Sequence, residues 1–279
     1  MKSKISKKFF LIIGFIFMAT ALGFMLYPTV SNAINSYFNE SSIVNYNNKT
    51  SSFSAADKSK YLSAAEDYNS SLRNRVSSFS YSTNSYIDGY DDILNFEDGI
   101  MGYIKIPKIN VSLPIYHGSS EDVLKKGAVH IPNTAFPIGG IGNHSVISAH
   151  TGYPTQVFFD NLVELEKDDL IKIYLLDECL TYKVTDINIV EPDDISSLQT
   201  DDSRDLLSLI TCYPYGVNSH RLIVTAERFE SNDTDSTEDE ITYAQIKPYN
   251  PIPIIIAVIL LCVILVIVVD IIRKKRRFK

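Results

Sequence analysis

The sequence predicts a mainly β domain, a closed eight-stranded β-barrel with short helices, which follows an N-terminal helical extension and lies between two flanking transmembrane helices. Eight short runs of β-branched and aromatic residues, broken by Gly, Pro, Asn and Asp, follow one another from Gly99 onward, and this pattern is typical of a barrel. No stretch alternates strands with long helices, so a doubly wound parallel sheet is not expected. Uncharged apolar runs near both ends of the chain predict the membrane helices.

The predicted barrel occupies residues 99–230. Its eight runs read GYIKI, VSLPIY, GAVHI, HSVISAH, LIKIYLL, LTYKVTDINIV, LLSLITC and RLIVTAERF. Between them, the segments VLKK and FFDNLVELEK are candidates for short helices. A domain of this length is large enough to build its own hydrophobic core.

Residues 29–98 form the predicted N-terminal extension. Apolar side chains recur there at steps of three and four, which predicts an amphipathic helix. These side chains are Tyr61, Leu62, Ala65, Tyr68, Leu72, Val76 and Phe79. Residues 77–90 follow neither the helical nor the strand period and are predicted to form a loop, with a short helical turn at YDDILNF.

Two uncharged runs, residues 9–27 and residues 252–269, predict the membrane helices. Basic clusters flank their outer ends, which places both termini in the cytoplasm and the middle of the chain outside. The terminal segments are a basic end with its apolar helix at 1–28, an acidic linker at 231–250, a membrane helix at 251–272 and a basic tail at 273–279. The first run, followed by Ser31-Asn32-Ala33, is also compatible with a cleavable signal peptide, and either alternative exports residues 29–250.

The charge of the chain is distributed unevenly. The formal net charge is -7, but the two basic ends hold 10 of the 26 Lys and Arg residues, so the exported part carries about -16. A surface this acidic repels phosphates, which argues against a nucleic-acid partner and favours basic partners.

The three cysteines leave one possible disulfide in the exported part. Cys262 lies inside the second apolar run, so only Cys179 and Cys212 can pair there. A single bridge is a sparse framework for a domain that builds its own core, and free thiols are the favoured alternative. The sequence shows no HExxH pattern, no paired CxxC and no glycine-rich phosphate loop, so we expect neither a metal nor another cofactor.

Cys212 and Arg221 are predicted to be neighbours. An apolar run ends in Thr211-Cys212, eight residues containing Pro, Gly and Asn follow, and Arg221 begins the next run. If the two strands pair antiparallel, the end of one lies across from the start of the next. A guanidinium beside a thiol favours the thiolate and can stabilise an oxyanion. The alternative role for Arg221 is a surface ion pair on an acidic domain.

A proton donor is the third group that such a site needs, and His150 is the best candidate because it closes the run HSVISAH just before a TGYP turn. Position in the sequence alone does not exclude three other histidines. His144 lies in the same run, His130 ends another, and His220 precedes Arg221.

The segment ITCYPYGVNSHRLIV closely resembles the signature of the sortase family, cysteine transpeptidases whose motif often begins with Thr-Leu, ends in Thr-Cys and is followed by Arg. Here Ser208 stands where that motif has its first Thr, and the rest reads Leu209-Ile210-Thr211-Cys212. The stretch SAHTGYPTQVFFDNL is similar to the surroundings of the family's histidine. The resemblance covers about residues 99–229 and implies catalytic Cys212, His150 and Arg221. Thr211 is expected to pack under the site, and a role in substrate binding is the alternative.

Three further segments look most like class C sortases, the pilin polymerases: GIMGYIKIPKINVSLPIYHG, VLKKGAVHI, and YPYGVN with HRLIV. Members of this class usually carry a lid with an Asp-Pro-aromatic tripeptide. This chain has no proline between Pro28 and Pro107, which puts the lid in doubt. Tyr81, Tyr86 or Tyr90 are candidates to replace the tripeptide, although exposed loop tyrosines are the more ordinary explanation.

The resemblance implies a reaction and its partners. The Cys212 thiolate would attack the Thr carbonyl of an LPxTG-like sorting signal, and a pilin lysine or an amine of the cell-wall precursor would resolve the thioester, at the membrane of a Gram-positive bacterium. Two alternatives remain. One is a housekeeping or accessory sortase that anchors proteins to cell-wall peptide, and the other is a non-catalytic, membrane-tethered binding barrel in which Cys212 is a core residue.

Overall fold

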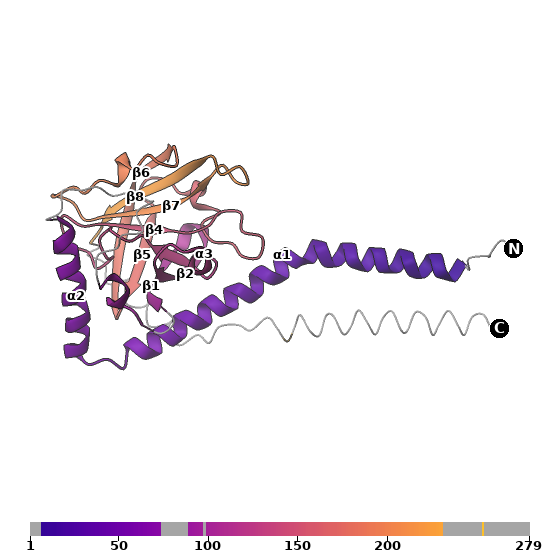
Figure 1. Cartoon of the computed structure of the whole chain (residues 1–279), viewed down its shortest axis with the longest axis horizontal. Helices are drawn as coiled ribbons and strands as arrows, with labels where there is room; N and C mark the ends of the chain where they lie inside the picture. The colour runs from indigo at the N-terminus through magenta and orange to yellow at the C-terminus, as the bar shows by residue number, and fades with distance from the viewer. Residues whose placement is uncertain (1–6, 74–88, 97–98, 231–252, 254–279) are drawn as a thin grey trace. The chain divides into compact units, whose positions relative to one another are not determined.

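The computed structural model describes residues 7–73, 89–96, 99–230 and 253. Eight strands close into a barrel in the order β1-β2-β3-β4-β7-β8-β6-β5 (Figure 1). The strands are β1 (Ile100–Ile106), β2 (Val111–His117), β3 (Ala128–His130), β4 (His144–Ser148), β5 (Leu170–Leu175), β6 (Glu178–Val190), β7 (Leu206–Tyr213) and β8 (His220–Arg228). Each of the eight predicted runs supplies one strand, so the prediction of a mainly β, eight-stranded closed barrel is confirmed.

The predicted helices that fall within the described residues are present, together with helical segments that the sequence pattern does not predict. They are α1 (Lys7–Thr50), α2 (Ala55–Arg73), α3 (Glu121–Leu124) and the 3-10 turns η1 (Tyr90–Asp92), η3 (Pro107–Ile109), η4 (Leu162–Glu164) and η5 (Ser196–Leu198). The amphipathic pattern of the extension corresponds as far as Leu72 to α2, which begins earlier than the first apolar residue of the pattern. Val76, Phe79 and most of the predicted loop at 77–90 lie outside the described residues. The short helix candidates of the barrel correspond to α3 and η4, and the YDDILNF turn contains η1.

The chain divides into two compact units. The first comprises Met1–Phe38, Pro154–Gln156 and Pro248–Lys279, and the second comprises Asn39–Tyr153 and Val157–Lys247. The eight strands, α2 and the last turns of α1 belong to the second unit. That unit therefore contains both the barrel and the candidate site.

The first apolar run lies in α1. Over Ile16–Thr50 this helix is long and apolar enough to cross a membrane, judged by its length and composition. A signal sequence near the N-terminus meets the same criterion. The helix therefore does not decide whether the first apolar run is a membrane helix or a signal peptide. The acidic linker, the second membrane helix with Cys262, and the basic tail lie outside the described residues, apart from residue 253.

The barrel is mixed, because two of its strand pairs are parallel. β2 pairs parallel with β3, β4 pairs parallel with β7, and the other neighbours pair antiparallel. In the β4–β7 pair, Ser148 lies opposite Ile210. The carboxyl ends of two strands far apart in the sequence therefore meet at one edge of the barrel.

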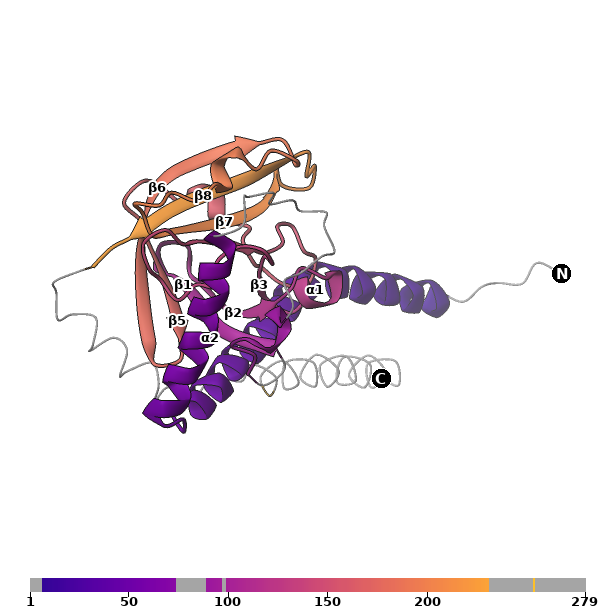
Figure 2. The ribbon, with the colours of Figure 1, turned by 60° about the vertical axis from the view of Figure 1, so that its left-hand side comes forward.

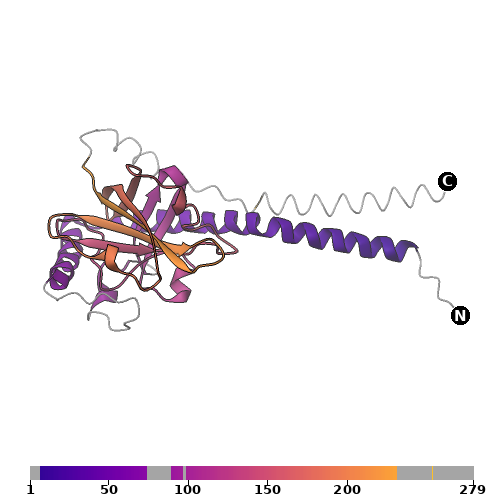
Figure 3. The same cartoon turned by 90° about the horizontal axis from the view of Figure 1, so that it is seen from above.

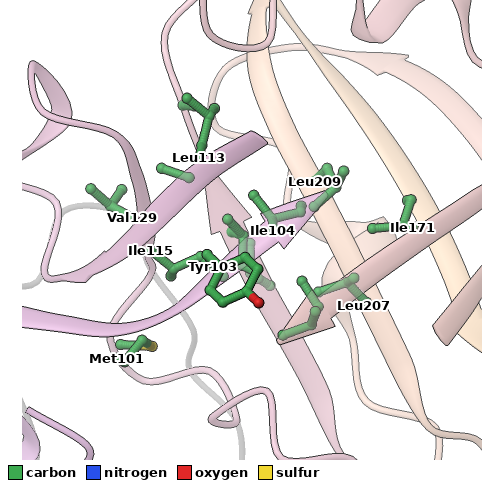
Figure 4. Close-up of a cluster of buried hydrophobic side chains, with 14 of the residues drawn as sticks. Met101, Tyr103, Ile104, Leu113, Ile115, Val129, Ile171, Leu207 and Leu209 are labelled. Carbon is green, nitrogen blue, oxygen red and sulfur yellow. The ribbon is translucent and has the colours of Figure 1, made fainter. Parts of the chain in front are cut away.

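The hydrophobic core draws on most of the strands. Figure 4 shows buried side chains that come from β1, β2, β3, β5 and β7; they include Met101, Ile104, Leu113, Ile115, Val129, Ile171, Leu207 and Leu209. Fully burying a Leu, Ile or Val side chain stabilises the fold by about 1.5–3 kcal/mol. Burial of this cluster fixes the strand register, because a slip of one residue would turn each set of side chains to the opposite face.

The second unit also includes two helical segments that pack against the barrel. Asn39, Ile43, Tyr46 and Thr50 are buried along one face of α1, at the three- and four-residue spacing of a helix. The α2 helix lies along one flank of the barrel (Figures 2 and 3). Its Asn69 side chain donates to the Phe136 carbonyl over 3.2 Å and accepts the Phe136 N–H over 2.7 Å.

Tyr46 connects α1 to β1 and to the turn between β5 and β6. Its hydroxyl donates to the Met101 carbonyl over 3.0 Å and accepts the Leu176 N–H over 2.7 Å, and the side chain is 2% exposed. Tyr46→Phe leaves that buried N–H without an acceptor, so we expect the free energy of unfolding to fall by about 1–3 kcal/mol. Denaturant titration of the full-length chain in detergent would measure the change.

Tyr61→Phe is the matched control for this prediction. The Tyr61 ring packs edge-on against Phe96 with centroids 4.9 Å apart, and its hydroxyl hydrogen-bonds to no residue that the structure describes. The control should change the free energy of unfolding by less than about 0.5 kcal/mol. Equal losses for the two variants would show that the Tyr46 hydroxyl has no special part in the contact.

Candidate active site

Cys212 and Arg221 lie opposite each other where β7 ends and β8 begins. The antiparallel register pairs Cys212 with Arg221 and, one step further into the loop, Tyr213 with His220. Both Cys212 and Arg221 are half-buried. The hairpin predicted from the sequence is therefore confirmed, and the thiol and the guanidinium belong to facing residues of adjacent strands.

The β7–β8 loop holds the Arg221 side chain by one nitrogen. The Pro214 carbonyl accepts the N–H groups of Val217 and Asn218, each over 3.0 Å, and this closes the turn. Arg221 Nη1 donates to the Asn218 carbonyl over 3.3 Å and to the His220 carbonyl over 3.0 Å. Within the described part of the chain, Nε and Nη2 make no hydrogen bond, so the other edge of the guanidinium remains available to an anion.

His150 reaches the same edge of the barrel through the parallel pairing of β4 with β7. The backbone continues this pairing past β4, because the Ala149 N–H donates to the Ile210 carbonyl over 3.2 Å. Thr211 adds a second link, since its hydroxyl donates to the Ala149 carbonyl over 2.8 Å. The residue before His150 is thus tied to the residue before Cys212.

Thr211 lies buried beneath Cys212 and links β7 to the segment that carries His150. Its side chain is only 3% exposed, and its hydroxyl is already engaged by the Ala149 carbonyl. These contacts fit the expectation that Thr211 packs and hydrogen-bonds under the site. They give no support to the tentative substrate-binding role, because a buried, engaged hydroxyl does not face a ligand.

The electrostatic surroundings of His150 favour the neutral imidazole. Burial lowers the pKa of His150 below its ordinary value, and Lys125 lowers this pKa further, whereas Glu121 and Asp160 raise it. The Nε2 atom is buried and has no hydrogen-bond partner among the described residues. A buried polar atom without a partner is costly in a finished fold, and a site that receives its partner with the substrate accounts for it.

The other candidate histidines have structural partners. His130 is fully buried with Nε2 2.8 Å from the Ala135 carbonyl, and burial lowers its pKa to about 3. His144 is also buried, with Nε2 2.8 Å from the Ser208 hydroxyl. His220 lies on the surface, with Nε2 3.4 Å from a carboxylate oxygen of Glu191. Of the four candidates, His150 combines a position beside β7 with an unpartnered ring nitrogen.

Tyr90 does not fit the role of a lid residue. Its side chain is 1% exposed, and its hydroxyl lies 2.9 Å from His130 Nδ1 and accepts the Gly118 N–H over 3.2 Å. The ring stacks on Phe136 with centroids 5.4 Å apart. Tyr90 is therefore a core residue. It is neither a plug nor an exposed loop tyrosine, because its ring and hydroxyl are both buried in these contacts. Tyr81 and Tyr86 lie outside the described residues.

The disulfide alternative is wrong, because neither Cys179 nor Cys212 forms a disulfide. The strands explain why. Cys179 is the second residue of β6 and lies opposite Tyr174 of β5, whereas Cys212 is the last but one residue of β7 and lies opposite Arg221.

Gly152 shapes the turn that follows His150. Its φ of +71° lies in the left-handed region, and a Cβ at this position would lie 3.4 Å from the Tyr215 ring of the β7–β8 loop. The turn that follows His150 therefore lies close to the β7–β8 loop. Gly152→Ala should lower the free energy of unfolding by about 1–2 kcal/mol, because a side chain disfavours this conformation. It should also lower kcat/KM roughly tenfold by shifting His150.

Gly118→Ala provides the matched control. Gly118 has a similar φ of +75°, and a Cβ there would meet nothing within 4 Å. We expect a similar loss of stability, measured by denaturant titration, with little change in kcat/KM. Equal losses of activity in the two variants would contradict a special role for the turn at Gly152.

The fold and the site define a β-barrel protein with a cysteine, a histidine and an arginine gathered at the ends of neighbouring strands. A family model described as the sortase domain matches residues 104–229. Sortase C-1 from Actinomyces oris shares 41% sequence identity, with a TM-score of 0.58, over 62% of this chain and 99% of that chain. The chain belongs to the sortase family.

Two further solved structures carry the same class name. Sortase C from Clostridium perfringens, solved with the C-terminal cell wall sorting motif, is 38% identical with a TM-score of 0.61, over 68% of this chain and 99% of that one. The pilus-related sortase C of Group B Streptococcus is 38% identical with a TM-score of 0.59, over 65% and 93%.

Curated relatives extend the comparison to other sortase classes. Sortase D of Bacillus subtilis is 34% identical over 114 residues, which is 41% of this chain. The match spans 54% of that relative's length, so the chain aligns with about half of it.

Proposed function

We propose that the chain is a membrane-anchored cysteine transpeptidase that cleaves an LPxTG-like sorting signal between Thr and Gly and transfers the acyl group to an amine. Cys212 is the nucleophile, Arg221 stabilises the oxyanion, and His150 is the proton donor. The observation that supports the proposal is the arrangement of the strand ends: Cys212 pairs with Arg221 across β7 and β8, and Ala149, the residue before His150, hydrogen-bonds to β7.

The first half-reaction forms a thioester. In the reactive form His150 carries the proton that Cys212 has lost. The Cys212 thiolate attacks the Thr carbonyl carbon, and the carbonyl oxygen becomes an oxyanion beside the open edge of the Arg221 guanidinium. The C–N bond then breaks, and the departing Gly nitrogen takes a proton from His150 Nε2. The enzyme retains the acyl group as a thioester on Cys212.

The second half-reaction releases the product. An acceptor amine attacks the thioester carbonyl carbon, gives up a proton to the now neutral His150, and displaces the Cys212 thiolate as the C–S bond breaks. We propose a lysine of a neighbouring pilin subunit as the acceptor, because the similar structures of the sortase C class include a pilus-related enzyme. The alternative acceptor is an amine of cell-wall peptide. The similarity of the chain to sortases of other classes supports this alternative.

The proposed location is the membrane of a Gram-positive bacterium, with the barrel outside and both termini in the cytoplasm. The apolar part of α1 supports a membrane anchor at the N-terminal end. The basic clusters at both ends of the sequence support the orientation.

Mass spectrometry of the full-length chain in detergent, incubated with a library of Leu-Pro-any-Thr-Gly peptides, would test the proposal. We expect an acyl adduct that proteolytic mapping assigns to Cys212. Two acceptors added in parallel, a pilin-like peptide with one lysine and a cell-wall peptide amine, would separate the two acceptor alternatives. Absence of any adduct across the library would contradict peptide transpeptidation and favour the non-catalytic binding barrel.

A further inference from the structure

The imidazole of His150 lacks a hydrogen bond that would fix its plane. Within the described residues, no group hydrogen-bonds to either ring nitrogen, and Nε2 is buried. A histidine that acts as acid or base is ordinarily oriented by a third group bonded to its second nitrogen. In this chain the orientation of His150 must come from packing.

Two aromatic rings supply that packing. The Tyr153 ring stacks on the imidazole with centroids 5.3 Å apart and planes 12° from parallel. The Phe158 ring meets the imidazole edge-on at 6.2 Å and 62°, and it meets Tyr153 at 5.7 Å and 67°. Such pairs contribute about 0.5–1.5 kcal/mol beyond the area that they bury. The three rings therefore form a cluster that restricts rotation of the imidazole.

The backbone holds the Tyr153 segment in place. The Asp160 carboxylate accepts the Gly152 N–H at one oxygen and the Phe158 N–H at the other, each over 2.9 Å. The His150 carbonyl accepts the Phe159 N–H over 3.0 Å. These bonds link residues on both sides of Tyr153 to the segment that carries Phe158. The Tyr153 ring is therefore carried by a turn that hydrogen bonds hold in place.

We propose that Tyr153 is a positioning residue, which fixes the plane of the His150 imidazole by stacking so that Nε2 presents its proton to the leaving amine. The inference rests on the proposed transpeptidase reaction and assigns a residue that the reaction scheme does not itself require. The stack replaces the hydrogen-bonding partner that His150 lacks.

Two substrates that differ in their leaving group can distinguish the positioning role of Tyr153 from a general contribution to stability. When an amide is the substrate, the C–N bond breaks only as the nitrogen receives the proton from His150 Nε2. When a 4-nitrophenyl ester of the same acyl peptide is the substrate, the C–O bond breaks to give a stable phenolate, and no proton is needed. Misorientation of His150 should therefore slow the amide reaction and spare the ester reaction.

The experiment compares the wild type, Tyr153→Leu and Tyr153→Phe as full-length chains in detergent, each with the amide peptide and the ester. For Tyr153→Leu we expect kcat/KM on the amide to fall by about 10- to 100-fold and kcat/KM on the ester to stay within about twofold. Tyr153→Phe keeps the stack and should stay within about threefold on both substrates. If the Leu variant does not fold, Tyr153→Met removes the ring with similar apolar bulk and gives the same comparison.

Tyr174→Leu is the matched control. The Tyr174 ring stacks on Tyr103 with centroids 4.6 Å apart and planes 5° from parallel, in the β1–β5 pair. Its loss should lower stability without changing the ratio of amide to ester rates.

The other possible outcomes would contradict either the positioning role of Tyr153 or the transpeptidase function. If Tyr153→Leu slows both substrates equally, or slows neither, the positioning role is overturned while the transpeptidase function stands. If the wild type turns over neither substrate, the proposed function is overturned and the inference falls with it.

Discussion

Cys212→Ala is expected to reduce transpeptidation to background, a loss of about 10³-fold or more. The methyl group of alanine cannot attack a carbonyl, and the described residues adjacent to this position in the strands, Tyr213, Arg221 and Thr211, offer no thiol. The acyl adduct should disappear together with product formation. Product release from a fluorogenic sorting peptide and mass spectrometry of the enzyme would measure the two losses separately.

Cys179→Ala is the control for this prediction. Cys179 also forms no disulfide, but it lies near the start of β6, paired with Tyr174. It should retain turnover within about twofold, since nothing places it among the reacting groups. Retained turnover in Cys212→Ala, or its loss in Cys179→Ala, would contradict the assignment of the nucleophile.

The strands were predictable because each one is a short β-branched or aromatic run bounded by turn residues. The run LTYKVTDINIV corresponds to β6 (Glu178–Val190), and RLIVTAERF corresponds to β8 (His220–Arg228). Both patterns are local, so the sequence reveals them. The pairing of Cys212 with Arg221 was also predictable, since a short loop between two strands implies a hairpin.

The proximity of the His150 segment to the Cys212 segment was not predictable from the spacing of residues in the sequence. It depends on the parallel pairing of β4 with β7, and long connections separate these strands in the sequence. Hydrophobic periodicity identifies strands but does not choose their partners or directions. The resemblance to a known family selected His150, and the structure supplies the physical reason, which is the Ala149 link to Ile210 and Thr211.

Two buried features of the N-terminal extension are not evident from composition. The Ser- and Asn-rich segment after residue 36 is helical as far as Thr50, and its signal is the spacing of Asn39, Ile43, Tyr46 and Thr50, half of which are polar. Tyr90 was grouped with loop tyrosines, although it begins η1 and packs in the core. The contacts that bury Tyr46 and Tyr90 reach residues far away along the chain, Met101 and His130 among them, so local composition does not reveal them.

Arg221→Lys is expected to slow thioester formation by about 10²-fold or more, comparable with the loss of one oxyanion-hole donor. Arg221 fixes its guanidinium through Nη1 to two loop carbonyls and keeps Nε and Nη2 open to the oxyanion. A lysine carries one nitrogen, so its ammonium cannot satisfy the loop and face the oxyanion in a fixed geometry at the same time. Stopped-flow acylation with the sorting peptide would measure the step.

Arg204→Lys makes the same chemical change at the opposite end of the β7–β8 pair. Arg204 donates through Nε and Nη2 to one carboxylate oxygen of Glu227, at 3.0 and 2.8 Å, and Glu227 lies opposite Leu206 where β7 begins. This pair is partly exposed, so the substitution should change stability by at most about 1 kcal/mol and leave acylation unchanged. If acylation by Arg221→Lys were as fast as by Arg204→Lys, a positive charge alone would suffice at the site, and the planar fork of Arg221 would have no part in stabilising the oxyanion.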